Sequence, residues 1–296
     1  MNFMLFIIES CCQEFLVVTH DGVSLHGPAG GHKQLALLKD MVKDLDYHYT
    51  REELYLLTYR QILRTSLTGP STLNLTPLVD PQDEYLLTTL AVDWVHQTLY
   101  WLSGAVLILH CGQLDGSSPR ILYRGLYIEQ NLNKLLVDPY VGKLFWMTNN
   151  EIHTSDLEGK GVRKDVFSSL GSVRNIAMDP SVQRLYLLVA GGAQESWRLV
   201  SCRYDGYNLH TFTDTPSVIY GLGGFQDRVF WIPHEEKSSV WLGNDDYQYT
   251  FSIYTINSTN HSNYSKPSLM LSFSEHVWNL RVYHEDLQTP KRQQLK

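Results

Sequence analysis

The chain has 296 residues, of which 31 are acidic and 24 are basic, so its formal net charge is −7. Apolar residues make up 43% and aromatic residues 12%, which is typical of a folded globular protein and not of a disordered one. The acidic charge and the lack of a basic stripe argue against nucleic-acid binding. No apolar run approaches the roughly 18–20 residues of a membrane span.

The start of the chain differs from the rest. It carries a short apolar stretch with no basic residue before it, so it does not resemble a signal peptide. This start is typical of a fragment of a longer chain, or of an isoform start, and residues 1–12 stay unassigned. Cys11 and Cys12 could pair outside this segment or remain thiols, whereas Cys111 and Cys202 are interpreted as buried thiols within strands.

From there on, a short apolar-aromatic segment recurs at nearly constant spacing. Its central aromatic residues are separated by 45, 45, 41 and 44 residues, and a weaker copy around Phe15 lies 40 residues before the first. Six copies at this spacing match the repeat of a β-propeller blade. The five central aromatic residues are Tyr55, Tyr100, Phe145, Tyr186 and Phe230.

A second feature recurs at a constant distance from these aromatic residues. Aspartate stands seven residues before three of them, at Asp93, Asp138 and Asp179, each time after a short apolar run. We interpret these side chains as acceptors for turn amides at the end of a strand. A ring of calcium ligands around a central channel is the alternative interpretation.

Each repeat is expected to form four short antiparallel strands, rich in β-branched and aromatic residues and bounded by Gly, Asn and Asp. In the third full unit these strands cover residues 133–138, 143–148, 151–156 and 162–168. The N-terminal unit lacks an inner strand, and residues 277–283 supply a spare one. The sequence therefore predicts an all-β fold over residues 13–286, followed by a tail or linker at 287–296. We expect a six-bladed β-propeller of four-stranded antiparallel blades, closed by a C-terminal strand that completes the N-terminal blade.

The repeats resemble a known family. Residues 91–101, AVDWVHQTLYW, and residues 135–161 resemble the YWTD repeats (class B repeats) of the low-density lipoprotein receptor family. Residues 282–290, VYHEDLQTP, are similar to the sequence at which that family's six-bladed propeller closes. The resemblance covers residues 13–290 and implies a cell-surface receptor ectodomain with adjacent EGF-like or fibronectin-like modules.

One element of the family's motif is missing from every copy. The terminal aspartate of YWTD is replaced, which puts in question the charged network that it supports in the family. Degenerate copies of this kind look more like the propellers of Sevenless/ROS-type receptor tyrosine kinases than those of lipoprotein receptors. The replacing residues are Thr58, Ser103, Thr148, Val189 and Pro233.

Four sequons predict N-linked glycans, at Asn74, Asn257, Asn260 and Asn263. Three of them fall within residues 257–265, a polar stretch expected to form a surface loop. Glycans there would suit an extracellular protein, and an unglycosylated polar loop is the alternative.

Aromatic residues fall into two predicted classes. Those that recur once per blade are expected to pack between neighbouring blades and not to bind ligand. They include Tyr100, Trp101, Phe145, Trp146, Tyr186, Phe230 and Trp231. Two longer loops mix aromatic and charged residues, which favours a protein interface. Ordinary solvated loops are the alternative, and the candidate ligand-binding residues there are Tyr127, Glu129, His234, Glu235, Trp241 and Tyr247.

No catalytic motif is present: the chain has no GxSxG, HExxH, P-loop or kinase signature. We therefore predict a non-catalytic extracellular propeller of a cell-surface receptor. It would bind a protein ligand or a neighbouring ectodomain module, with no cofactor and no metal. The alternative is a secreted six-bladed hydrolase with a calcium ion in its channel. An intracellular WD40 scaffold would show the GH…WD signature, which is absent, and would leave the clustered sequons unexplained.

Overall fold

The computed structural model describes most of the chain outside its two ends. The described ranges are 14–19, 22–27, 31–38, 40–68, 75–79, 86–104, 106–127, 134–148, 151–164, 166–190, 196–215, 218–225, 228–233, 240–241, 247–248, 251–257, 267–273 and 277–288. Almost all of the regular structure is β-strand. Among these residues, no helix has the length and apolar character needed to cross a membrane.

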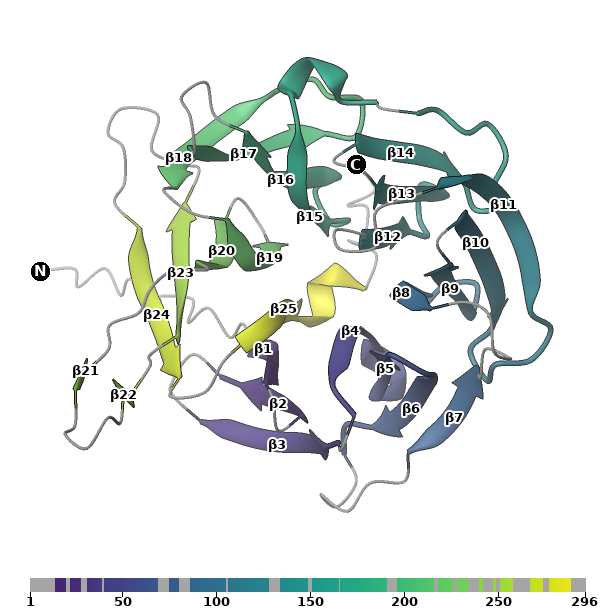
Figure 1. The fold of residues 1–296 in the computed structure, drawn as a ribbon, viewed down its shortest axis with the longest axis horizontal. Coiled ribbons are helices and arrows are strands. Elements are labelled where there is room, and N and C mark those ends of the chain that lie inside the picture. Colours follow the sequence, from purple (N-terminus) through teal and green to yellow (C-terminus); the bar gives the residue numbers. More distant parts are fainter. Residues whose placement is uncertain are drawn as a thin grey trace, which may run out of the picture.

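Six antiparallel sheets, the blades, stand around a central axis (Figure 1). Within each blade the strands are named here from the axis outward. Blade I contains β25 (Val277–Tyr283), β1 (Glu14–Thr19), β2 (Gly22–His26) and β3 (His32–Leu37). Blade II contains β4 (Val42–His48), β5 (Glu53–Thr58), β6 (Ile62–Ser66) and β7 (Thr76–Val79). Blade III contains β8 (Leu87–Asp93), β9 (Thr98–Ser103), β10 (Val106–Gln113) and β11 (Arg120–Tyr127).

The second half of the chain repeats this arrangement. Blade IV contains β12 (Lys134–Asp138), β13 (Lys143–Thr148) and β14 (Glu151–Asp156). Blade V contains β15 (Val173–Asp179), β16 (Arg184–Ala190), β17 (Trp197–Arg203) and β18 (His210–Thr215). Blade VI contains β19 (Ile219–Phe225), β20 (Arg228–Pro233), β23 (Phe251–Asn257) and β24 (Ser268–Phe273). A separate pair, β21 (Val240–Trp241) and β22 (Tyr247–Gln248), lies within the connection from β20 to β23.

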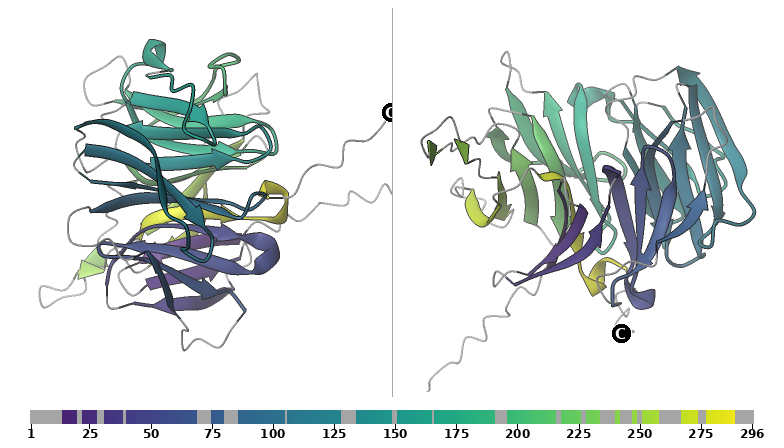
Figure 2. Two further views of the ribbon diagram at one scale, coloured as in Figure 1. Left: turned by 90° about the vertical axis from the view of Figure 1, so that its right-hand side faces the viewer. Right: turned by 60° about the horizontal axis from the view of Figure 1, so that its bottom comes forward.

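The predicted six-bladed propeller is confirmed, and so is its closure by strands from both ends of the chain. The last strand, β25, pairs antiparallel with β1, from Glu14 opposite Tyr283 to Thr19 opposite Val277. Figure 2 shows β25, in yellow, beside the purple strands of blade I. The inner strands then contact one another around the whole ring, which leaves the sheets in a closed circle.

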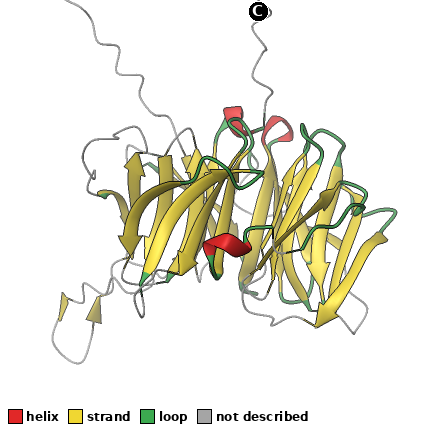
Figure 3. Ribbon diagram, turned by 90° about the horizontal axis from the view of Figure 1, so that it is seen from above, coloured by secondary structure: helices red, strands yellow, loops and turns green. Residues whose placement is uncertain are grey.

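The ring has two distinct ends. Two short 3₁₀ helices, η1 (Tyr49–Arg51) and η3 (Glu285–Leu287), follow the last residues of inner strands, and η2 (Ser168–Leu170) precedes the inner strand β15. Seen from the side, η1 and η3 lie at one end and η2 at the other (Figure 3). We call these ends the η3 face and the η2 face.

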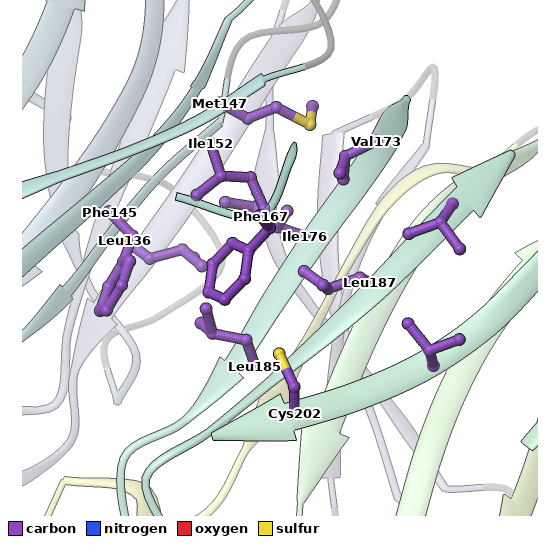
Figure 4. Close-up of a cluster of buried hydrophobic side chains, with 12 residues drawn as sticks. Leu136, Phe145, Met147, Ile152, Phe167, Val173, Ile176, Leu185, Leu187 and Cys202 are labelled. Carbon is purple, nitrogen blue, oxygen red and sulfur yellow. The ribbon is translucent and has the colours of Figure 1, made fainter. Parts of the chain in front are cut away.

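The core lies between blades as well as within them. In one cluster Phe145 and Leu136 of blade IV pack with Leu185, Leu187 and Cys202 of blade V (Figure 4). Phe167, from the connection between the two blades, also packs in this cluster. Such alternating strands bury large side chains against the next blade, which is the main apolar contribution to stability in this ring.

One detail of the sequence prediction is wrong. The fourth strand expected at 162–168 is reduced to a single bridge between Thr154 and Arg163, and η2 begins at Ser168. The turn before it has positive φ at Gly159 (71°) and Gly161 (64°), but blade III has the same pattern at Gly116 and Ser118 and still forms its outer strand, so the turn does not account for the difference.

Packing continues past residue 286, where the propeller was expected to end. Leu287 and Gln288 are buried, and the Gln288 Nε2 donates to the carbonyl oxygen of Tyr47 at 2.6 Å. The packed propeller therefore includes these two residues.

Candidate functional site: the η3 face and the central channel

The three recurring aspartates end inner strands at the η3 face and are fully buried. In each, Oδ1 accepts hydrogen bonds from backbone N–H groups of the turn that follows. The acceptors and donors are Asp93 with Val95 (3.0 Å) and His96 (2.7 Å), Asp138 with Tyr140 (3.0 Å) and Val141 (3.3 Å), and Asp179 with Ser181 (2.9 Å). The carboxylates thus fix the shape of the turns that make up the η3 face.

The second carboxylate oxygens of two of these aspartates are also engaged. The Asp93 Oδ2 lies 2.8 Å from His96 Nδ1, and the Tyr204 hydroxyl donates to Asp138 Oδ2 at 2.8 Å. Burial raises the pKa of Asp138, although these hydrogen bonds act against that rise. Nowhere in the described ranges do three or more His, Cys, Asp or Glu side chains converge on a point that could hold a metal ion.

The turns held by Asp93 and Asp138 expose apolar and aromatic side chains. Val95 and Tyr140 are each 43% exposed and Val141 is 37% exposed. The Trp94 Nε1–H donates to the Tyr140 hydroxyl at 3.3 Å, and the two rings meet edge to face at 6.1 Å. We call Trp94, Val95, Tyr140 and Val141 the aromatic patch.

Hydrogen bonds hold the aromatic patch to neighbouring elements of the η3 face. The Tyr140 hydroxyl donates to the Gln288 carbonyl oxygen at 2.9 Å, and the Gln288 side chain in turn accepts from the N–H of Tyr49 at 2.7 Å. The patch is therefore tied to η1 and to the residue that follows η3. On the same end, Tyr207 and Leu209 in the turn between β17 and β18 are 76% and 48% exposed.

The axis of the ring holds a buried charge cluster. Asp44 accepts hydrogen bonds from Thr89 Oγ1 (2.6 Å), Lys134 Nζ (2.9 Å) and Asn279 Nδ2 (2.9 Å), and Arg281 Nη2 lies 3.9 Å away. Together with Asp44 itself, on β4, these residues come from the inner strands of four blades. Burial by itself would raise the pKa of Asp44, but Lys134 and Arg281 more than offset it and hold the value at about 2.

The channel leaves little room between this cluster and η3. A cavity of about 70 Å³ lies there, lined by residues including Asp46, Met178, Gly223 and Leu287. At about 30 Å³ per water it holds roughly two water molecules. Leu287 and Gln288 line this cavity, so η3 and the residue after it cover part of the axis at the η3 face.

A hydroxyl–imidazole pair occupies the position of the missing YWTD aspartate in two blades. In blade III the Ser103 hydroxyl lies 2.7 Å from His110 Nε2, and this imidazole stacks on Trp101 at 5.3 Å. In blade IV Thr148 and His153 make the same pair at 3.1 Å. Burial, and then the charge of Arg124, lower the pKa of His110 to about 4, so this imidazole is neutral at pH 7.

The recurring aromatic residues all lie in apolar clusters that join adjacent blades. Tyr100 and Trp146 pack in the cluster between blades III and IV, and Trp101 in that between blades II and III. Phe145 lies between blades IV and V, Tyr186 and Trp231 between V and VI, and Phe230 between VI and I. Cys111 and Cys202 are buried free thiols, and burial raises the pKa of Cys202 to about 12.

The predicted binding and glycosylation residues are mostly outside the described residues. This applies to Glu129, His234, Glu235, Asn74, Asn260 and Asn263, and to Cys11 and Cys12. The backbone places Tyr127 at the end of β11, Trp241 and Tyr247 in the β21–β22 pair, and Asn257 at the end of β23. The strand ends at Tyr127 and Pro233 lie at the η2 face, opposite the aromatic patch.

Sequence reasoning missed the aromatic patch and the charge cluster. A signal for the patch was present, because Trp94 and Tyr140 stand one and two residues after an in-register aspartate, in turns that must face solvent. The cluster had only a weak signal, the two aspartates at 44 and 46 in an otherwise strand-like segment.

No protein-family model matches the chain. Among solved structures, nidogen from a nidogen/laminin complex superposes with a TM-score of 0.68 at 14% identity, covering 91% of this chain and 98% of that one. TolB from Acinetobacter baumannii gives a TM-score of 0.68 at 8% identity, covering 91% and 66%. An oligogalacturonate lyase in complex with manganese gives 0.58 at 10% identity, covering 81% and 69%. At these identities the likeness shows the β-propeller fold alone.

Proposed function

We propose that this chain is a non-catalytic, extracellular protein-interaction propeller of a cell-surface receptor, and that it docks its ligand on the η3 face. The observation that carries the proposal is the aromatic patch. Val95, Tyr140 and Val141 are exposed, Trp94 is half-buried, and their turns are held by buried aspartates, so a partner could cover the patch without first ordering a loop. Exposed aromatic residues on a rigid scaffold are typical of protein interfaces.

Two further observations support the proposal. The nidogen structure, which is similar over nearly its whole length, was solved as a complex with laminin, a protein ligand. In this chain the carboxylate oxygens of Asp93 and Asp138 are already taken by protein donors, which disfavours a catalytic calcium ring. The finer assignment to a Sevenless/ROS-type receptor rests on the degenerate YWTD copies and belongs to the same proposal.

The test compares the two end faces. The chain would be secreted behind an added signal peptide and screened against a panel of purified extracellular domains. For a domain that binds, Val95→Ser with Val141→Ser should weaken binding about five- to tenfold, since docking would cover the exposed two-fifths of each valine, worth about 0.6 kcal/mol apiece. Val95 and Val141 are chosen over Tyr140 because the Tyr140 hydroxyl takes part in the hydrogen bonds that hold the patch to the rest of the η3 face.

Two variants control this measurement. Leu269→Ser removes a 58% exposed leucine from the outer strand of blade VI and should leave binding unchanged. Trp241→Ser tests the two loops that the sequence predicts to bind ligand, whose flanking strand ends lie at the η2 face. Loss of binding in Trp241→Ser but not in the valine variant would move the site to that face. Mass measurement of the 257–265 peptide after glycosidase digestion would test the glycans; bare asparagines would remove the main support for an extracellular location.

A further inference from the structure

A cavity lies at the seam where blades VI and I meet. Its volume is about 220 Å³, enough for roughly seven water molecules at about 30 Å³ each. The end of β24 and the start of β3 lie side by side there, at the outer rim of the ring (Figure 1). This seam pocket is therefore about three times as large as the cavity on the axis, and it is separate from the aromatic patch.

The lining of the seam pocket is polar and contains no carboxylate. It offers hydroxyl groups, imidazoles and a carboxamide, and one phenyl ring forms an apolar wall. The residues are Thr19, Ser24, His26, His32, Gln34, Ser272 and Phe273. A pocket rich in hydrogen-bond donors and free of acidic groups suits a ligand that carries a negative charge.

Two imidazoles stand next to each other in this lining. His26 and His32 are direct partners across β2 and β3, with ring centroids 5.7 Å apart and planes 18° apart. The phenyl ring of Phe273 meets His26 edge to face at 4.8 Å. Burial, and then the nearby His32, lower the pKa of His26, because two cations this close repel each other. An anion bound at the edges of both rings would offset that repulsion.

Ser24 contacts the His26 imidazole and also lines the seam pocket. Its hydroxyl lies 2.7 Å from His26 Nε2, and the residue is 5% exposed. When His26 is protonated, Nε2–H must donate to the serine oxygen, which turns the serine hydrogen away from the imidazole. Ser24 then becomes a further donor for a ligand in the pocket.

We propose that the seam pocket binds a small organic anion through a carboxylate or sulfate group held by His26, His32 and Ser24, with Phe273 against the apolar part of the ligand. The proposal goes beyond the docking of a protein on the η3 face and does not depend on it. A metal ion is less suited, because no third His, Cys, Asp or Glu of the described residues joins the two imidazoles.

The test is a titration of the secreted propeller, followed by NMR of the histidine side chains. The probes are sodium sulfate, sodium glucuronate and neutral glucose, at pH 6.0 and pH 8.0. From β1, β2, β3 and β24, the only titratable groups among the described lining residues are the two histidines. Because an anion favours their charged forms, binding should be at least about tenfold tighter at pH 6.0. Glucose should not bind.

Comparing the two anionic probes shows whether the pocket prefers a carboxylate or a sulfate group. Tighter binding of glucuronate than of sulfate would identify a sugar acid, with contact to Phe273, and the reverse order a sulfate group. His26→Gln should abolish the shifts of the His32 resonances. His210→Gln is the matched control, since His210 meets Phe212 edge to face at 4.9 Å on blade V in the same way, and it should bind as the parent does.

Three results would overturn the proposal. The first is the absence of any His26 or His32 shift with either anion at pH 6.0. The second is unchanged binding in His26→Gln, which would place the anion elsewhere. The third is a response of these histidines to zinc chloride alone, which would make the pocket a metal site.

Discussion

Asp44 holds together the inner strands of four blades, so its removal should destabilise the whole ring. In Asp44→Ala, the ammonium of Lys134 loses its hydrogen-bonded partner, and Lys134 and the guanidinium of Arg281 keep only the charge of Asp46 nearby. Breaking a buried ion pair from one side typically costs about 3–5 kcal/mol. Thr89 and Asn279 also lose their acceptor, so we expect the upper part of this range. Urea unfolding, followed by tryptophan fluorescence, measures the free energy of unfolding directly.

The double variant Asp44→Leu with Lys134→Met is the control. It removes one charge of each sign and fills the space with apolar atoms, so it should recover more than half of the lost stability, since apolar replacements of buried pairs are often neutral. A cost below about 1 kcal/mol for Asp44→Ala would refute this account of the cluster. So would a double variant less stable than the single one.

The same residue predicts an acid transition. The pKa of Asp44 is about 2 in the folded protein, below its usual value near 3.9 when unfolded. A carboxyl with a depressed folded pKa contributes stability above the unfolded pKa, and this contribution is lost as pH falls through the folded value. The parent should therefore lose about 2 kcal/mol between pH 5 and pH 2, and Asp44→Ala should lose less.

Two further predictions concern packing and histidine protonation. In Gly224→Ala the new Cβ would meet the buried ring of Tyr186, so we expect a loss of about 1–3 kcal/mol in urea unfolding. Gly31→Ala, where a Cβ meets nothing within 4 Å, should cost little, and equal costs would contradict the reasoning. The pKa of His110 is about 4 when folded, so the unfolded state takes up its proton first as pH falls below about 6.5. Stability should fall by about 1–2 kcal/mol down to pH 4, after a discount for partial solvent exposure, and thermal unfolding of His110→Gln should show a smaller fall.

The sequence was sufficient to predict the ring of blades and its closure, because both follow from the repeated pattern along the chain. The aromatic spacing, the in-register aspartates and the spare strand at 277–283 each repeat a pattern that a single blade imposes. Of the inner strands with stated bounds, β12 begins one residue after the expected 133–138 and β25 matches 277–283. The outer strand of blade IV was wrong although its turn at Gly159 and Gly161 repeats that of blade III, because the chain enters η2 at Ser168, where the repeat pattern places the end of a strand.

The charge cluster could not be predicted in the same way. Asp44 and Asn279 are 235 residues apart in sequence, and only ring closure brings them to 2.9 Å. An aspartate in a strand is equally consistent with a solvent-facing position, so burial had to be seen in the structure. The seam pocket has the same origin, because Phe273 and His26 meet only where the last complete blade adjoins the first.

The order of the strands in blade I also affects how the protein is made. β1, β2 and β3 leave the ribosome well before their inner partner, β25, which begins 240 residues after β3 ends. At about 5–20 residues per second, the nascent chain waits tens of seconds or less with one edge of this sheet unpaired. Phe15 and Val17, fully buried in the finished ring, lack their final neighbours during that time. A chaperone that shields residues 14–19 until β25 has been translated would therefore act on an aggregation-prone stage of synthesis.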